Sequence, residues 1–226
     1  MFSGKYQSLR FFFLKKKTNA AKPLRFLIAA YRRRNQILFF AMPRTSSGSI
    51  GEVLAKHGIE IHGHRRRPGY KFLRDRDDCK NVQIISVVRH PYSRFLSAYF
   101  ALVKGGYNAE DKEDALKFMK TGESVNAFIS RHYKAGGNSP DLLSQRHFTP
   151  QFDYLKDIDG RLLPVRLFVF GQKDFTDDLL RYVGISLRVT ITQKHVTKKN
   201  QELSQSSKDI LQLWYERDFE FFFKHD

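Results

Sequence analysis

The sequence predicts an α/β domain in which a mainly parallel sheet lies between two layers of helices. Three apolar runs of strand length, at residues 37–41, 82–88 and 166–170, alternate with segments whose apolar residues recur at helical spacing. Strands that alternate with helices form parallel units, whose sheets are covered on both faces and bind ligands at the carboxyl ends of the strands. We therefore expect a P-loop-like, three-layer α/β/α fold.

Each element is predicted by its own residues. The run 37–41 ends at Pro43, and small polar residues separate it from apolar residues 50, 53 and 54, as in a strand, loop and helix. Residues 82–88 are rich in β-branched side chains and precede an amphipathic segment with apolar residues 95, 96, 99, 102 and 103. A short second strand is expected just before the segment 61–64. Residues 110–133 have a helical pattern that Gly122 breaks, 136–140 form a loop, a helix begins near Asp174, and 204–223 form a terminal helix.

Length and composition favour a folded single domain at residues 37–226, preceded by a basic extension at 1–36 with a short amphipathic helix around 24–31. The chain has 226 residues, of which 41% are hydrophobic and 14% aromatic. A single cysteine excludes a disulfide within the chain and a thiol-rich metal site. No apolar run reaches the roughly 20 residues of a membrane-spanning helix, and no secretory signal is expected. We expect a cytoplasmic protein.

The positive charge is concentrated near the N-terminus. The formal net charge is +17, and residues 1–76 hold 18 Lys and Arg against three acids. Such a field attracts an anionic ligand or surface, although a basic segment can also be a solvated tail. We expect peripheral contact of the extension with the inner face of an anionic membrane, and no specific nucleic acid.

The loop after the first strand has the character of a phosphate site. At residues 42–49 the sequence M-P-R-T-S-S-G-S lies where a strand-to-helix unit presents backbone N–H groups and a positive helix end to an anion. It is not a Walker A loop, because the leading Gly and the Lys after Gly48 are missing. The alternative is a simple helix N-cap. The candidate phosphate-binding residues are Arg44, Thr45, Ser46, Ser47, Gly48 and Ser49.

A second motif gives this loop a specific interpretation. Residues 89–99 read R-H-P-Y-S-R-F-L-S-A-Y, with Arg89 at a strand end and Ser97 two turns into the next helix. The pair of motifs resembles the sulfotransferases that use 3′-phosphoadenosine 5′-phosphosulfate (PAPS). There, P-K-T-x-x-T-S binds the 5′-phosphosulfate side, and R-D-P-x-x-R-F-x-S-x-Y holds the 3′-phosphate. The resemblance implies that Arg89 and Ser97 bind the 3′-phosphate, as suits a guanidinium and a hydroxyl donor.

The resemblance covers most of residues 37–223. H-F-T-P-Q at 147–151 is similar to the H-W/F-x-P-Q element of carbohydrate sulfotransferases, the uronyl, heparan 2-O- and chondroitin types among them. Residues 168–175 resemble their strand-to-helix segment, 194–200 their closing loop, and 215–219 their Y-x-x-D-F helix. The implied roles are acceptor binding for His147 and Gln151, and donor binding for Lys194 and Lys198. The chain departs from the pattern with Arg44 for the usual Lys and His90 for Asp, which leaves an inactive relative as an alternative.

The candidate general base lies in I-H-G-H at residues 61–64, which is similar to the H-G-H of uronyl 2-O-sulfotransferases. A histidine with a pKa near 6.5 suits proton transfer at neutral pH. We favour His64 over His62, with His147 in reserve and Glu52 and Asp153 after it; a surface histidine pair is the alternative. The adjoining bases are candidates for binding an acidic acceptor, or are a solvated face: Arg65, Arg66, Arg67 and Lys71.

These motifs predict a PAPS-dependent carbohydrate O-sulfotransferase. The sulfuryl group would move to an acceptor hydroxyl by in-line displacement with a histidine base and no metal, since arginines, hydroxyls and helix N–H groups can stabilise the charge. The acceptor is expected to be a carbohydrate, acidic or lipid-linked. The alternatives are a non-enzymatic binder of polyanions (nucleic acid, glycan or anionic membrane) and a nucleotide-dependent phosphotransferase.

Overall fold

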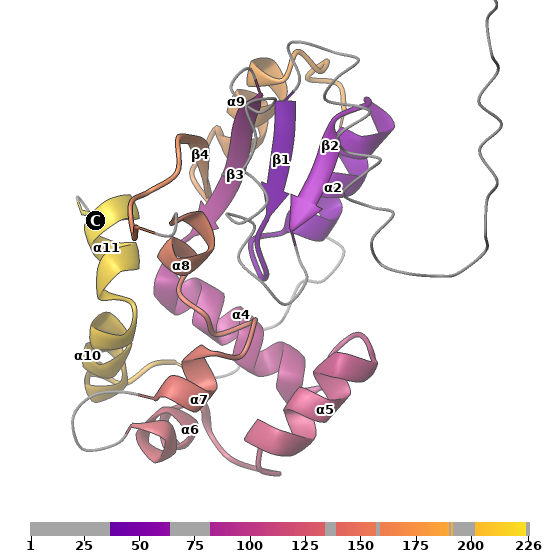
Figure 1. Ribbon diagram of the computed structural model, residues 1–226. Helices are drawn as coiled ribbons and strands as arrows, with labels where there is room; N and C mark the ends of the chain where they lie inside the picture. The colour runs from indigo at the N-terminus through magenta and orange to yellow at the C-terminus, as the bar shows by residue number, and fades with distance from the viewer. Residues whose placement is uncertain are drawn as a thin grey trace, which may run out of the picture.

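The computed structural model describes residues 37–63, 82–133, 139–156, 159–189, 191 and 202–224. Within them the chain forms an α/β fold with a four-stranded sheet (Figure 1). The strands are β1 (Ile37–Ala41), β2 (Glu60–Gly63), β3 (Gln83–Arg89) and β4 (Val165–Phe170). The helices are α2 (Ser47–Lys56), α4 (Pro91–Val103), α5 (Ala109–Phe118), α6 (Val125–His132), α7 (Pro140–Leu143), α8 (Gln151–Leu155), α9 (Phe175–Tyr182), α10 (Gln205–Trp214) and α11 (Glu216–Phe222).

The sheet is parallel throughout, in the order β2-β1-β3-β4. The register pairs Ala41 with Gly63 and Phe40 with Ser86, so β1, β2 and β3 end at the same side of the molecule. Gly63 has a φ of 109°, and a side chain there would come within 2.4 Å of the Ala41 carbonyl oxygen. Only glycine allows this close approach of the two strand ends.

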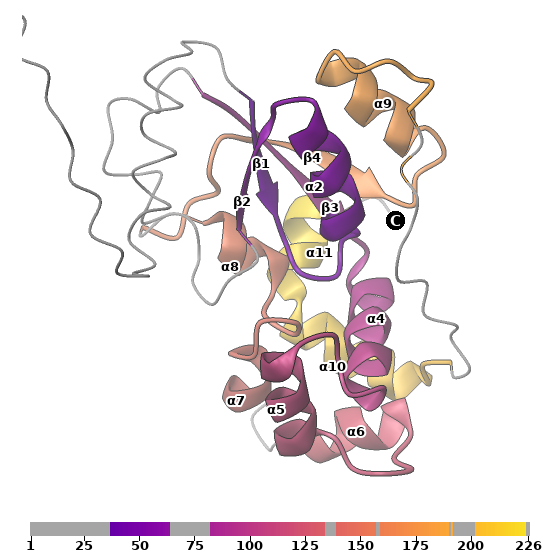
Figure 2. The ribbon, with the colours of Figure 1, turned by 90° about the vertical axis from the view of Figure 1, so that its right-hand side faces the viewer.

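Alternating side chains of the strands fill two separate cores. Phe39 and Val87 point to one face and pack with residues of α2 and α9, while Leu38, Phe40 and Val88 point to the other and pack with Leu155 of α8 and with Phe223. Figure 2 shows α2 and α9 on one side of the sheet and α8 on the other. The predicted fold, a mainly parallel sheet covered by helices on both faces, is confirmed.

A third core lies beyond the carboxyl ends of the strands. It is formed among helices α4, α6, α7 and α10, with Phe95, Phe128 and Trp214 among its buried aromatic side chains. Only His90 separates the end of β3 from the start of helix α4, which runs from the sheet into this helical layer (Figure 1). Residues at the strand ends therefore lie at the junction between the sheet and the helical layer.

The element boundaries differ from the prediction in a few places. The expected terminal helix at 204–223 is two helices, α10 and α11, with a break at Tyr215. Most of the expected loop at 136–140 and the expected helix at 24–31 lie outside the described residues; Pro140 itself begins α7. The helical pattern of 110–133 corresponds to α5 and α6, which are separated at Gly122 as predicted.

Candidate functional site

The loop between β1 and α2 is a tight turn with an unusual backbone. Arg44 and Ser46 both have left-handed conformations, with φ of 68° and 60°. Non-glycine residues adopt this conformation rarely, and where the surrounding structure enforces it the site is often functional. The Thr45 hydroxyl donates to the Met42 carbonyl at 3.0 Å, and the Ser47 hydroxyl donates to the same carbonyl at 2.6 Å. These bonds hold the loop closed.

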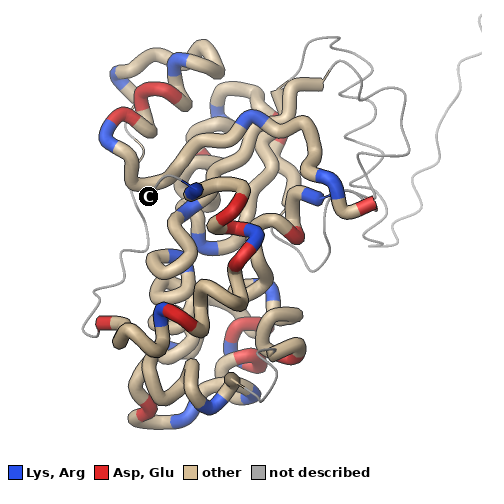
Figure 3. Tube along the Cα trace, turned by 90° about the vertical axis from the view of Figure 1, so that its left-hand side faces the viewer, with Lys and Arg blue, Asp and Glu red and all other residues tan. Residues whose placement is uncertain are grey.

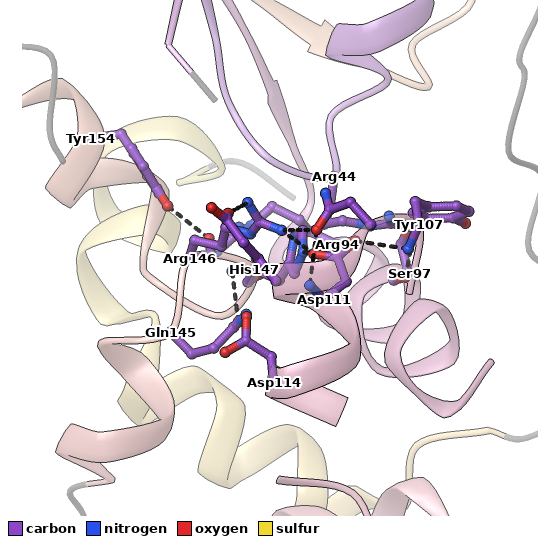
Figure 4. Close-up of polar contacts among 12 residues, drawn as sticks. Arg44, Arg94, Ser97, Tyr107, Asp111, Asp114, Gln145, Arg146, His147 and Tyr154 are labelled. Atoms are coloured by element: carbon purple, nitrogen blue, oxygen red, sulfur yellow. Dashed lines mark hydrogen bonds and ion pairs between the residues drawn. The ribbon is translucent and has the colours of Figure 1, made fainter. Parts of the chain in front are cut away.

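The Arg44 side chain joins the first predicted phosphate motif to the second. Its Nη2 donates to the Ser97 carbonyl at 2.8 Å and to the Ser97 hydroxyl at 3.0 Å, and its Nε lies 3.3 Å from that hydroxyl. The guanidinium also lies 5.3 Å from the centre of the Tyr107 ring. Figure 4 shows Arg44 beside Ser97 and Tyr107. Two segments 53 residues apart thus meet where the sheet ends.

Arg89 lies on the same side, at the last position of β3. Its Nη1 donates to the Arg44 carbonyl at 3.2 Å, its Nε donates to the Ser93 hydroxyl at 3.0 Å, and the guanidinium lies 5.0 Å from the centre of the Phe170 ring. Burial, together with the charges of Arg44 and Arg94, lowers the pKa of Arg89 to about 10. The guanidinium remains charged at neutral pH, at a cost that a bound anion would relieve.

No described carboxylate neutralises Arg44 or Arg89. Within the part of the chain that the structure describes, neither guanidinium has an ion pair with Asp or Glu. Buried charges usually have a partner of opposite sign. Two neighbouring guanidiniums, one from the loop after β1 and one from the end of β3, lie next to the start of α2 and can bind a phosphate or sulfate with charge-assisted hydrogen bonds.

Arg94, the second arginine of the motif at 89–99, has a structural role. Its exposed fraction is 1%, and its two terminal nitrogens donate to the carbonyls of His147 and Thr149. The guanidinium also lies 5.6 Å from the centre of the Tyr215 ring. Arg94 therefore fastens the segment 147–149 to helix α4.

Gln151 is buried against Arg89. The side chain has no exposed surface, and its amide bonds both the N–H and the carbonyl of Arg89. The structure shows the Gln151 amide occupied inside the protein by the Arg89 backbone. Gln151 supports Arg89.

His147 belongs to a buried charged cluster (Figure 4). Its Nε2 lies 2.8 Å from Oδ1 of Asp111, which also accepts a hydrogen bond from Arg146, and the Tyr107 N–H donates to Oδ2 of Asp111 at 2.9 Å. Burial alone would raise the pKa of Asp111, but the hydrogen bonds from His147, Tyr107 and Arg146 outweigh it and hold this pKa well below its usual range. Burial lowers the pKa of His147, which Asp111 offsets only in part. His147 is therefore neutral at pH 7, and its side chain is only 7% exposed.

Some of the other predicted residues lie within the described residues, and the rest lie outside them. Thr45, Ser47 and Ser49 are buried at the start of α2, Ser46 is half-buried, and Gly48 is exposed with open space where a side chain would be. His62 is half-buried beside the Phe40 ring, and burial lowers its pKa. Outside the described residues lie the favoured base and most of the predicted acceptor and donor cations: His64, Arg65, Arg66, Arg67, Lys71, Lys194 and Lys198.

Tyr107 and Asp111 were absent from the prediction, and Asp218 entered it only as a member of the motif at 215–219. Tyr107, Asp111 and Asp218 each contact a predicted residue, respectively Arg44, His147 and Gln151. Tyr107 follows Gly105 and Gly106, both with positive φ, and this glycine pair before a half-exposed aromatic residue is the one local signal that marked the segment.

The described residues contain no group of three or more His, Cys, Asp or Glu side chains that could hold a metal ion. Among them there is also no helix of the length and apolar character needed to cross a membrane. Lys and Arg nearly balance Asp and Glu there, and the two signs are interspersed along the chain (Figure 3). Most of the +17 formal charge therefore belongs to the remaining segments.

Comparison with known proteins gave no match to any family model, curated protein or solved structure.

Proposed function

We propose that the chain is a sulfotransferase, which transfers the sulfuryl group of PAPS to a hydroxyl of a carbohydrate acceptor. One observation carries the proposal. The two segments that resemble donor-binding motifs, 42–49 and 89–99, meet through the contacts of Arg44 with Ser97 and of Arg89 with the Arg44 carbonyl. A nucleotide with phosphates at both its 5′ and 3′ ends needs two adjacent cationic sites of this kind.

The contacts of Ser97 are compatible with binding of the 3′-phosphate. In the present arrangement its hydroxyl oxygen accepts from Arg44. A hydroxyl has one donor proton in addition to two acceptor lone pairs. Ser97 can therefore donate to a phosphate oxygen while it still accepts from Arg44, and Arg89 can add a charge-assisted bond to the same phosphate.

In the proposed reaction the acceptor oxygen bonds to sulfur as the bond between sulfur and the 5′-phosphate oxygen breaks. Arg44 stabilises the negative charge that develops on the leaving phosphate, and the acceptor proton passes to a histidine. The products are the sulfate ester and 3′-phosphoadenosine 5′-phosphate (PAP). Such charge stabilisation is strong in a site that excludes water, because the dielectric constant is low there.

We assign the base to His64. The supporting observation is the register of β2, in which Gly63, the residue before His64, pairs with Ala41, the residue before the phosphate loop. His147 is buried against Asp111, and its Nδ1 is also buried, so it presents no exposed nitrogen to an acceptor, while His62 is half-buried beside the Phe40 ring.

Transfer of labelled sulfate tests the proposal. Protein incubated with radiolabelled PAPS and a panel of soluble and lipid-linked glycans should yield a labelled glycan and an equal amount of PAP. Absence of transfer to every glycan, together with absence of PAP binding in a thermal-shift assay, would contradict it.

The concentrated charge favours a second candidate, a non-enzymatic binder of polyanions. Residues 1–76 hold 18 Lys and Arg against three acids. A mobility shift that depends strongly on salt and lacks nucleotide selectivity would favour this candidate. Under the sulfotransferase proposal, the same charge would attract an acidic acceptor and would place a cytoplasmic protein peripherally on an anionic membrane through residues 1–36.

A further inference from the structure

The backbone of Arg89 lies where β3 has passed the end of its neighbour. The ladder between β1 and β3 ends at the pair Phe40–Ser86, three residues before Arg89. The N–H and the carbonyl of one strand residue point to the same side, and both need partners when they are buried. On the side of β1 the partner of Arg89 is a side chain, whereas on the other side β4 stays paired with β3 up to the pair Arg89–Phe170.

Gln151 provides both partners. Its Oε1 accepts from the Arg89 N–H at 2.8 Å, and its Nε2 donates to the Arg89 carbonyl at 2.9 Å. The side chain is fully buried. Because one amide makes both bonds, a turn or shift of Gln151 would displace the Arg89 backbone, from which the guanidinium extends.

Asp218 of α11 in turn holds Gln151. Its Oδ2 accepts from the Gln151 N–H at 2.9 Å and from Nε2 at 3.2 Å, and its Oδ1 accepts from the Phe152 N–H at 2.7 Å. Asp218 has no exposed surface, and no described cation forms an ion pair with it. A buried carboxylate held by N–H donors alone is costly, and it fixes the start of α8 and the orientation of the amide.

The guanidinium is steered at its other end as well. Nε donates to Ser93 and Nη1 to the Arg44 carbonyl. Among the hydrogen bonds of the described residues, none uses Nη2. The side chain is thus fixed at its backbone and at two nitrogens, with one nitrogen remaining for a ligand.

We propose that Gln151 and Asp218 are positioning residues, which act through Arg89 to set the selectivity of the site for a nucleotide that carries a 3′-phosphate. The inference rests on the proposed function, since it takes that phosphate as the ligand of Arg89. It connects the C-terminal helix α11 to the donor site through two buried side chains.

The test measures discrimination, which a purely structural role would not change. The dissociation constants of PAP and of adenosine 5′-phosphate (AMP) are determined by calorimetry at fixed ionic strength. The constant of AMP divided by that of PAP is the ratio that reports recognition of the 3′-phosphate. Gln151→Met keeps the volume of the side chain but removes both bonds to Arg89. We expect the ratio to fall about tenfold, as suits the weakening of one charge-assisted hydrogen bond.

Gln145→Met is the matched control. Gln145 is also buried, its Nε2 donates to Asp114 at 2.7 Å, and its Oε1 accepts from the His147 N–H at 2.7 Å. The same change there should lower stability but leave the ratio within about twofold of the parent. Asp218→Asn is the second variant. Its amide nitrogen would face the N–H donors that Asp218 accepts from, so Gln151 would be held less well and the ratio should fall. This variant tests the inference if Gln151→Met does not fold.

Two results would overturn the inference alone: a folded Gln151→Met with the parent ratio, or an equal loss of ratio in Gln145→Met. If the parent itself binds PAP and AMP equally, the proposed function fails and the inference fails with it.

Discussion

Replacing Arg89 with methionine separates stability from ligand binding at the site. The pKa of Arg89 is lowered from 12.5 to about 10 by burial and by two neighbouring arginines, which corresponds to about 3 kcal/mol of disfavoured charge. Because a lowered pKa of a cation is a cost at every pH below both values, the whole of this cost is present at pH 7. The side chain regains part of it through its bonds to Ser93 and to the Arg44 carbonyl, at about 1 kcal/mol each.

Methionine removes both the cost and the two bonds, and it can still pack against the Phe170 ring. We therefore expect the free energy of unfolding of Arg89→Met to stay within about 1 kcal/mol of the parent or to rise, which is unusual for a mostly buried residue. The affinity for PAP should instead fall about 10- to 150-fold, the value of a hydrogen bond to a charged group.

Denaturant unfolding measures the first quantity and calorimetric titration with PAP the second. Arg181→Met is the control, because Arg181 is exposed on α9, where it pairs with Asp178, and its replacement changes the net charge equally. The control should bind PAP within about twofold of the parent. The reasoning is refuted if Arg89→Met binds PAP as tightly as the control, or if it loses more than about 3 kcal/mol of stability, as a structural arginine would.

Three further predictions concern Arg44 and His147. Arg44→Ala should lose most sulfuryl transfer at saturating donor while Arg44→Lys retains much of it, because the developing phosphate charge requires a cation; equal rates in Ala and parent would remove Arg44 from the mechanism. Arg44→Gly should be more stable than Arg44→Ala by about 1 kcal/mol, since only glycine adopts a φ of 68° without strain, and denaturant unfolding compares them. Burial lowers the pKa of His147, so the unfolded chain gains a proton below pH 6.5 that the folded chain does not. As the pH is lowered through this range, the free energy of unfolding should fall by at most about 1.4 kcal/mol per pH unit. His147→Asn should flatten this slope in thermal unfolding between pH 5 and 7, and an unchanged slope would show that His147 is not its source.

The strands and most of the long helices could be predicted because their signals are local. The predicted strands 37–41 and 166–170 differ from the observed β1 and β4 by at most one residue. β1 is a buried parallel strand with a continuous apolar run, and β4 is a partly buried edge strand that carries the apolar run 167–170. The break between α10 and α11 could not be predicted in this way. It lies at Tyr215, whose hydroxyl donates to the carbonyl of Phe148, 67 residues earlier in the chain. The periodicity of residues 204–223 is local and cannot indicate such a distant contact.

The same distinction holds in the site. Arg44, Arg89 and Ser97 lie in short motifs, so the sequence could point to them, and the structure brings all three together. Gln151, His147 and Asp218 also lie in motifs, but the motifs do not indicate which residues these side chains contact. Gln151 meets Asp218 from 67 residues away, and His147 meets Asp111 from 36 residues away. Such pairs depend on how helices pack in three dimensions.

The central claim is that the site recognises a nucleotide by the position of its second phosphate, and one comparison tests it directly. PAP and its isomer 2′-phosphoadenosine 5′-phosphate have the same charge and differ only in the attachment of one phosphate. Calorimetric titration of the parent protein with both should give an affinity for PAP at least tenfold higher, about 1.4 kcal/mol, because Arg89 and Ser97 have fixed positions. Equal affinities for the two isomers would contradict the claim, because attraction of polyanions by charge alone does not distinguish them.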